Sequence, residues 1–343
     1  MRNVFLIIFS IFCIFFFANS AISLIITEKG KEGMSGIPDS RGLPWQASMT
    51  INVVTVDPKA ELGKKLFFDP ILSKDGTVSC ASCHKPEHGF ADDKPVSIGI
   101  KGQKGERNTP TAFNTANLKF LFWDGRASSL EEQVLGPIEN PVEMGEKVSN
   151  VLEKLNKNPG YAKEFATIFK KTPISTSQLV HAIAAFERTL ISKDSDYDRF
   201  LAGDSMALSD SANHGLALFN GKAMCIACHK GPDFTDGGFH NIGLPITDDV
   251  GRAKISVSGK DTRKFKTPTL REVANTAPYF HSGEFDTLEA VIAYYNAGGG
   301  EDTYKDPLKK PLNLNQQEQK DLVAFLKSLT GRQPKITPPT LSH

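Results

Sequence analysis

The sequence has almost no net charge, and this limits the partners that it can bind. Its 40 lysines and arginines nearly balance its 39 aspartates and glutamates, so the formal charge is +1 at pH 7. Binding to nucleic acid through overall charge needs a large excess of basic residues. We therefore expect no nucleic-acid partner, and any charged partner must bind a local patch.

Cysteine is also scarce, and its positions leave none for a structural disulfide. Cys13 lies in an apolar N-terminal run, and the other four form two copies of one pattern: Cys80-Ala81-Ser82-Cys83-His84 and Cys225-Ile226-Ala227-Cys228-His229. C-x-x-C-H is the attachment signature of c-type haem, in which the thiols bind the porphyrin and the histidine binds the iron. The separation of 145 residues (225 − 80) is far longer than in a zinc ribbon. The sequence therefore predicts two covalently bound haem c groups.

The N-terminal residues predict export to the periplasm. Arg2 precedes an apolar run from Val4 to Phe17, and residues 1–20 resemble a signal peptide cleaved after Ser20. The apolar stretch continues to Ile26, which is long enough to span a membrane, so an uncleaved membrane anchor is the alternative. Residues 21–56 include a stretch rich in Gly, Pro and Ser, and we expect them to form a linker or N-terminal arm.

Strand signals are few, and the pattern after residue 56 is mainly helical. Pro58 to Phe68 predicts a first helix, Ser129-x-x-Glu132 opens one that Pro137 should stop, and Asp286-x-x-Glu289 opens another. Each haem motif follows a short helix and a turn, which indicates a weak internal duplication. We predict a mainly α fold with two cytochrome-c-like haem domains, 57–195 and 196–312, followed by a C-terminal helix and tail, 313–343.

Methionine, the usual partner of histidine in electron-transfer cytochromes c, is missing after the second motif. In the helix expected after Asp286, positions 288, 291, 292 and 295 share one face, which directs Tyr295 inward. Tyr295 is then either an ordinary core aromatic or the sixth ligand of the second iron, with His240 and His281 as rival ligands. A phenolate ligand would lower the reduction potential and favour higher oxidation states.

Further segments resemble the family of bacterial di-haem cytochrome c peroxidases and MauG. The resemblance covers residues 57–329, nearly the whole mature chain. It is carried by Arg107-Asn108-Thr109-Pro110-Thr111, Phe122-Trp123-Asp124-Gly125-Arg126, Leu130-Glu131-Glu132-Gln133, Pro137-Ile138-Glu139-Asn140-Pro141-Val142-Glu143-Met144-Gly145, Thr267-Pro268-Thr269-Leu270-Arg271 and Ala277-Pro278-Tyr279-Phe280-His281.

This resemblance implies roles for residues around the first haem. His84 would hold the peroxidatic haem iron, and His229 the iron of the electron-relay haem. Glu143 would be the distal carboxylate that moves a proton between the two peroxide oxygens, with Gln133 and Pro137 beside it in the distal pocket. Without the resemblance, Glu143 would be read as a solvated carboxylate.

The resemblance also implies two features between the haems. Trp123 would be an aromatic bridge for electrons or holes, although by itself it reads as a core aromatic. Asn108, Thr276 and Pro278 would surround a calcium ion, with Thr276 and Pro278 supplying backbone carbonyls.

Two departures from the family pattern bear on reactivity. In many of these peroxidases a histidine after the first motif caps the first iron until the enzyme is partly reduced. Ile100 stands at that position here, and residues 89–166 contain no histidine, so we expect a five-coordinate first haem that is open to peroxide. Tyr295 falls where the peroxidases carry methionine, which is the MauG-like arrangement and favours Tyr295 as the iron ligand.

The sequence thus predicts an exported MauG-like di-haem enzyme that reacts with hydrogen peroxide. As a peroxidase, it would draw electrons from a small c-type cytochrome or a cupredoxin through the second haem. The alternative is a MauG-like oxidase that uses the peroxide-oxidised haems to modify a side chain of a partner protein. A third reading is a non-catalytic di-haem electron-transfer cytochrome. Relatives are often dimers, so a homodimer is also implied.

Overall fold

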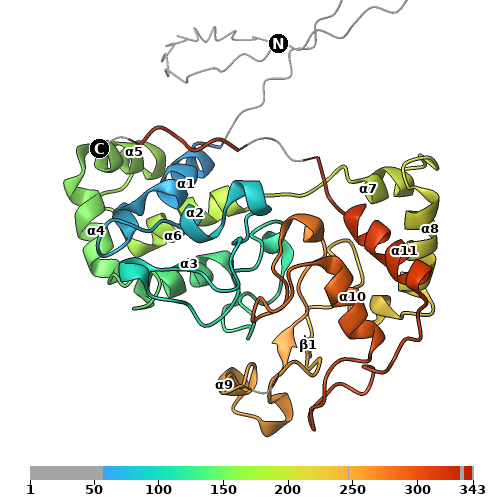
Figure 1. Cartoon of the computed structure of the whole chain (residues 1–343). Helices are drawn as coiled ribbons and strands as arrows, with labels where there is room; N and C mark the ends of the chain where they lie inside the picture. The colour runs from blue at the N-terminus through green and yellow to red at the C-terminus, as the bar shows by residue number, and fades with distance from the viewer. Residues whose placement is uncertain (1–56, 246, 333–335, 342–343) are drawn as a thin grey trace, which may run out of the picture. The chain divides into compact units, whose positions relative to one another are not determined.

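The computed structural model describes residues 57–245, 247–332 and 336–341 (Figure 1). The predicted signal peptide or anchor (1–20) and the arm (21–56) lie outside these residues. Among the helices of the described part, none combines the length and the apolar character needed to cross a bilayer.

The described chain is mainly α-helical, as predicted. Its α-helices are α1 (Pro58–Phe68), α2 (Cys80–Cys83), α3 (Leu130–Glu139), α4 (Val148–Lys157), α5 (Pro159–Phe169), α6 (Thr176–Glu187), α7 (Asp196–Leu201), α8 (Asp210–Asn220), α9 (Ala253–Ser256), α10 (Leu288–Asn296) and α11 (Gln316–Lys327). Short 3-10 turns are η1 (Pro70–Leu72), η2 (Pro86–His88), η3 (Ile100–Gly102), η4 (Thr115–Asn117), η5 (Cys225–Ala227), η6 (Gly259–Asp261) and η7 (Val273–Asn275). The sheet within the described residues is one antiparallel pair, β1 (Phe239–His240) with β2 (Phe265–Lys266).

Two helix boundaries differ from the sequence-based expectation. Pro137 does not stop α3, which continues to Glu139, because Asn140 N still donates to Gly136 O at 3.0 Å and closes the last turn. A proline removes only its own N–H from the helix ladder. The α10 helix is capped by Thr287 rather than Asp286, since the Thr287 hydroxyl accepts from Ala290 N at 3.1 Å.

The internal duplication appears in the packing of two helix pairs, α1 with α6 and α8 with α11 (Figure 1). In each pair a glycine lets the backbones touch. A Cβ on Gly63 would lie 1.8 Å from Ala182 O, and one on Gly215 would lie 2.0 Å from Asp321 O. Four residues after each glycine, a phenylalanine meets a phenylalanine of the partner helix, with ring centroids 5.2 Å apart for Phe67–Phe186 and 5.0 Å apart for Phe219–Phe325.

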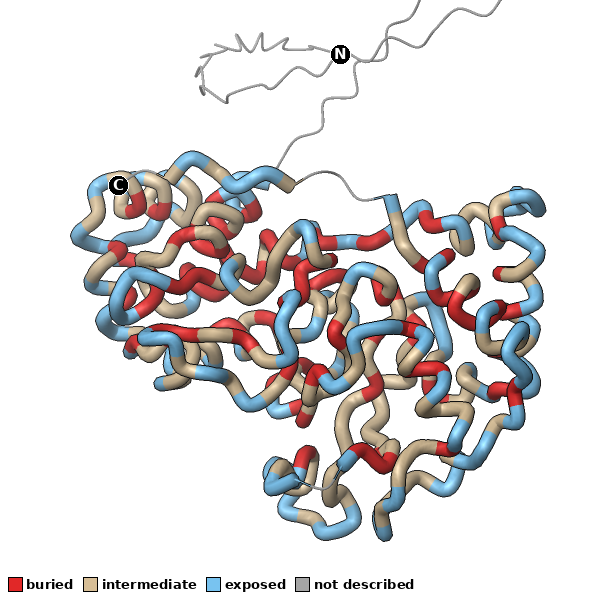
Figure 2. The backbone as a smooth tube through the Cα atoms, in the orientation of Figure 1, coloured by how far each residue is buried: buried red, intermediate tan, exposed pale blue. Residues whose placement is uncertain are grey.

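These two pairs form the centres of separate hydrophobic cores. The first core contains buried residues from Leu62 to Leu190, and the second contains buried residues from Phe219 to Leu329. Figure 2 shows buried residues along both helix pairs. The C-terminal segment is divided between them, because α11 belongs to the second core whereas Ile336 packs against the first.

A partly buried arginine, Arg107, joins segments that belong to the two halves of the chain. Arg107 donates from Nε and Nη2 to both carboxylate oxygens of Asp249, at 2.7 and 2.8 Å, and from Nη1 to Asp124 at 2.7 Å. A bidentate pair of this kind fixes direction as well as distance. It therefore anchors the turn that carries Trp123.

Candidate haem sites

The two C-x-x-C-H motifs adopt short helical turns, and their histidines have matching environments. The ring Nδ1 of His84 lies 2.9 Å from Phe90 O, and that of His229 lies 2.9 Å from Phe234 O. A carbonyl can only accept, so Nδ1 carries the proton and the lone pair of Nε2 is free for iron. Burial lowers the pKa of both imidazoles, that of His229 to about 4, which keeps them neutral.

The thiols of both motifs are available for haem attachment. Cys80, Cys83, Cys225 and Cys228 are all free of disulfides. Burial raises the pKa of Cys80, Cys83 and Cys225, so these sulfurs are neutral thiols in the protein without its porphyrin. Neutral sulfur fits an apolar porphyrin edge, and the residues of both motifs therefore suit covalent haem.

The second motif opens into a cavity of about 210 Å³. Cys225, Cys228 and His229 line it, together with Tyr295 and Trp123. Apart from these and a few other polar or charged side chains, the lining is mainly apolar, as a porphyrin requires.

Tyr295 lies in this cavity beside the second motif, as the helix-face argument expects. Leu288, Val291 and Ile292 are buried on the same face of α10. Burial is the main cause that raises the pKa of the Tyr295 phenol, and the charges of Cys225 and Cys228 add to it. The Lys309 ammonium lies 4.6 Å from the Tyr295 ring centroid. The neighbouring Tyr294 is not among the cavity-lining residues; its hydroxyl donates to Ile242 O and accepts from Gly300 N.

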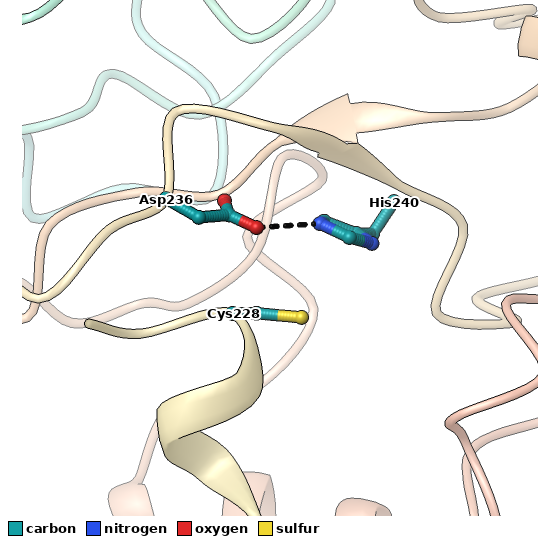
Figure 3. A group of neighbouring side chains, drawn as sticks. All are labelled: Cys228, Asp236 and His240. Carbon is teal, nitrogen blue, oxygen red and sulfur yellow. Dashed lines mark hydrogen bonds and ion pairs between the residues drawn. The ribbon is translucent and has the colours of Figure 1, made fainter.

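His240, a rival ligand, is held between two carboxylates. Its Nε2 lies 3.0 Å from Asp236 (Figure 3). Its Nδ1 lies 2.6 Å from Asp306. While Cys228 is a free thiol, a hydrogen bond with it, together with those two carboxylates, raises the pKa of His240 to about 9. Both ring nitrogens are engaged by Asp306 and Asp236, so neither is free to bind iron. Cys228, Asp236 and His240 also lie close enough for a metal ion, but the Cys228 sulfur is committed to the porphyrin in a haem-loaded protein.

His281, the other rival, lies against aromatic rings next to Trp123. Its ring stacks on Phe265, with centroids 3.5 Å apart and planes 15° apart, and meets the Trp123 ring edge at 6.3 Å. Burial lowers its pKa to about 4. It therefore remains neutral and keeps a lone pair.

Glu143 lies near the first motif. Its negative charge contributes to raising the pKa of both Cys80 and Cys83, which places the carboxylate in their surroundings. Asn140 donates from Nδ2 to Glu143 Oε1 at 2.6 Å. Burial raises the pKa of Glu143, while the Asn140 hydrogen bond and the Arg126 charge lower it. A buried carboxylate oriented by a neutral donor can accept and return a proton.

The loop that carries Ile100 is held against the turn of Glu143. Ile100 N donates to Glu143 O at 2.8 Å, and the Ile100 side chain is buried in the first core. A Cβ on Gly99 would lie 2.0 Å from Val142 O, so this close approach requires glycine. Gln103 Nε2 adds a bond to Pro141 O at 3.1 Å.

Gln133 and Pro137 lie on α3, which leads into the same turn. Pro137 O accepts from Met144 N at 3.2 Å and so connects the end of the helix to the Glu143 turn. Gln133 lies one turn earlier, and within the described residues no hydrogen bond joins its side chain to Glu143.

Trp123 is fixed by contacts from both halves of the chain. Its Nε1 donates to Asn108 O at 2.8 Å, and its backbone O accepts from Lys266 N at 2.7 Å. It lines the cavity of the second motif. The ring therefore occupies a position between the two motif-bearing halves.

The three residues expected around calcium all belong to the lining of the same cavity. Asn108, Thr276 and Pro278 all line it. Asn108 is buried, and its Nδ2 donates to Lys94 O at 3.1 Å, which orients the amide. Amide and backbone oxygens are ligands that suit Ca²⁺.

Sequence reasoning missed three polar side chains at these sites. Asn140 belongs to the family-like segment 137–145, and its place three residues before Glu143 is the feature that could have indicated their hydrogen bond. Lys266 and Lys309 enter the second cavity from a strand and a loop, and no local pattern in the sequence indicated this.

Comparisons with known proteins agree with this arrangement. The profile of a family described as di-haem cytochrome c peroxidase matches residues 57–206, and that of cytochrome c matches residues 212–330. The methylamine utilization protein MauG of Methylorubrum extorquens is 42% identical over 286 residues, which cover 82% of this chain and 81% of that protein. The cytochrome-c peroxidase IdrP1 of Denitromonas iodatirespirans is 39% identical over 318 residues, covering 83% and 84%. A solved MauG-like protein associated with microbial copper homeostasis superposes with a TM-score of 0.76 at 34% identity, covering 81% of this chain and 90% of that one.

Proposed function

We propose that Glu143 serves the first haem, which His84 would hold and which would react with peroxide. The proposal starts from the family of this chain, which belongs to the di-haem cytochrome c peroxidases and MauG. Membership makes the chain a di-haem oxidoreductase with two haem c groups. When bound, the haems supply the iron that reacts with peroxide and a store for oxidising equivalents.

The observation that carries this proposal is the position of Glu143 beside the first motif. Its carboxylate takes the proton from one peroxide oxygen and returns it to the other, so that water can leave. Asn140 holds Oε1 in place, and burial raises the pKa of Glu143, which makes its protonated form easier to reach. Pro137 and Gln133 support the pocket from α3.

In the second half of the chain, His229 and Tyr295 would hold the iron of the second haem. Tyr295 lines the cavity of the second motif, whereas both ring nitrogens of His240 are bound to carboxylates, and both facts support this choice. Trp123 connects the two sites as an aromatic bridge. The hydrogen bond from Nε1 to Asn108 O keeps the ring in one orientation, which favours reproducible electron transfer.

A calcium ion between the two sites is a further part of the proposal. Asn108 would supply its side-chain oxygen, and Thr276 and Pro278 their backbone carbonyls. The fixed Asn108 amide fits this role, because Nδ2 is already bound and Oδ1 is the oxygen left to ligate.

The oxidising equivalents have two candidate uses. A peroxidase would pass them to a small c-type cytochrome or cupredoxin in the periplasm, with the enzyme as a monomer or a homodimer. A MauG-like oxidase would use them to modify a side chain of a partner protein, and the cavity-facing Tyr295 together with the buried Ile100 favours this second use. Steady turnover of reduced cytochrome c with peroxide would identify the peroxidase. Peroxide-dependent modification of a copurifying protein would identify the oxidase.

The direct test is rapid mixing of the diferric protein with one equivalent of peroxide and no reductant. The wild type is expected to lose its high-spin signal within milliseconds. Glu143→Gln should slow that loss by roughly a hundredfold or more. Glu139→Gln, at an exposed position of α3, serves as the control and should react normally. A normal rate in Glu143→Gln would remove Glu143 from the reaction, and a wild type that reacts only after partial reduction would show that the first iron is capped.

A further inference from the structure

The cavity of the second motif has a charge imbalance in its walls. Two lysines, Lys266 and Lys309, line it, and no aspartate or glutamate is among its lining residues. Asp236 and Asp306 do not line the cavity, and both are bound to His240, which does. An anionic occupant would therefore find cationic partners there.

Of these two lysines, Lys266 has the weaker partners for its ammonium group. Its Nζ donates to Thr267 O at 3.5 Å, at the outer limit of a hydrogen bond, and no ion pair among residues 57–332 includes it. Burial lowers its pKa to about 8, so at neutral pH the side chain is still mainly an ammonium ion. A charged group in such surroundings is costly unless it is paired.

The backbone of Lys266 is firmly placed relative to Trp123. Lys266 N donates to Trp123 O at 2.7 Å, and β2 pairs Lys266 with Phe239 of β1. The Lys266 backbone therefore lies beside that of Trp123, and the residue forms part of the cavity wall. Lys309, by contrast, lies against the Tyr295 ring and has Asp306 as a neighbour.

We propose that Lys266 is the counter-ion of a propionate of the second haem and that its charge raises the reduction potential of that haem. This inference rests on the proposed binding of the second haem by His229. Haem carries two propionates, and its ferric form has one more positive charge than its ferrous form. A fixed ammonium nearby disfavours the ferric form by Coulomb repulsion. Lys266 is thus a positioning residue that acts on the haem and opposes the effect of a phenolate ligand.

The test is a spectroelectrochemical titration of both haems in the full haem-loaded chain. Lys266→Met should shift the ferric–ferrous equilibrium of the second haem about tenfold toward ferric, which for a one-electron couple is about 59 mV. Lys266→Arg keeps the charge and should stay close to the wild type. Lys264→Met is the matched control, because Lys264 pairs with Asp261 and is not part of the cavity lining.

A second-haem potential in Lys266→Met equal to that of Lys264→Met would overturn the proposal, as would a shift confined to the first haem. If Lys266→Met does not retain the second haem, its potential cannot be measured, and the haem content of two further variants tests the proposal instead. Retention by Lys266→Arg with loss in Lys266→Gln supports a counter-ion, whereas loss in both variants overturns it. A wild type that binds a single haem would refute the proposed function itself, while unchanged potentials refute only the role of Lys266.

Discussion

The backbone N–H of Ile100 donates a 2.8 Å hydrogen bond to the carbonyl oxygen of Glu143. This bond joins the loop that carries Ile100, where the resemblance to the peroxidases implies a capping histidine, to the turn that carries Glu143, the proposed distal carboxylate. Burial of the Ile100 side chain and the absence of a side chain at Gly99 allow the two segments to lie in direct contact.

Gly99→Ala should disturb this contact. The new Cβ would lie 2.0 Å from Val142 O, so the backbone must move, and we expect a loss of about 1–3 kcal/mol in the free energy of unfolding. The reaction with peroxide should also slow, because the Glu143 turn moves with it. Gly105→Ala is the control, since its Cβ would meet nothing closer than 3.5 Å. Thermal unfolding and stopped-flow absorbance measure both effects, and equal behaviour of the two variants would contradict the prediction.

Asn140→Ala should move the acid limb of the peroxide reaction to higher pH. The Asn140 hydrogen bond lowers the pKa of Glu143 against the effect of burial, so its removal raises that pKa further. The reaction needs the carboxylate form, and the rate therefore falls at a higher pH than in the wild type. We expect a displacement on the order of one pH unit.

The control for this experiment is Asn150→Ala, which removes a similar bond to Glu146 at 2.9 Å. Its pH–rate profile should match that of the wild type. An unchanged profile in Asn140→Ala would mean that Glu143 does not control the acid limb.

Tyr295→Met should alter the absorption spectrum of the second haem and raise its reduction potential, because a thioether stabilises ferric iron less than a phenolate does. We expect a shift of at least tenfold in the ferric–ferrous equilibrium, about 59 mV. Tyr294→Phe removes the neighbouring hydroxyl, which binds Ile242 O and Gly300 N, and should leave the spectrum unaltered. A spectrum that responds to His281→Gln and not to Tyr295→Met would assign the ligand to His281.

Glu187→Gln should flatten the dependence of stability on pH. Glu187 is buried, its Oε2 has no hydrogen-bond partner among the described residues, and burial raises its pKa to about 8 from an ordinary value of 4.5. Between these two values the unfolded chain releases a proton that the folded chain keeps. Stability therefore falls as pH rises from 5 to 8, by up to about 1.4 kcal/mol per pH unit.

Thermal unfolding at several pH values would measure this slope. Glu153→Gln, at an exposed carboxylate paired with Lys157, should keep the slope of the wild type. An equally steep slope in Glu187→Gln would show that other groups cause it.

Much of the local structure followed from the sequence because its signals act over a few residues. The helix Pro58–Phe68 has the predicted bounds, since Asp57 caps it and Pro58 starts it. Capping boxes at Ser175 and Asn315, which also involve only residues three apart, begin α6 and α11. Pro137 and Asp286 were misjudged, because neighbouring hydrogen bonds decided whether the helix continued and which residue capped it.

By itself the sequence determined that this is a di-haem protein, because C-x-x-C-H is local chemistry that any fold of the segment must keep together. It also placed Tyr295 on an inward helix face, since helical periodicity needs no tertiary contact. Only the tertiary structure decided that His240 lies between Asp236 and Asp306, that Asn140 binds Glu143, and that Lys266 faces the second cavity. These contacts depend on the positions of segments far apart in the chain or on the orientation of side chains, and packing alone sets both.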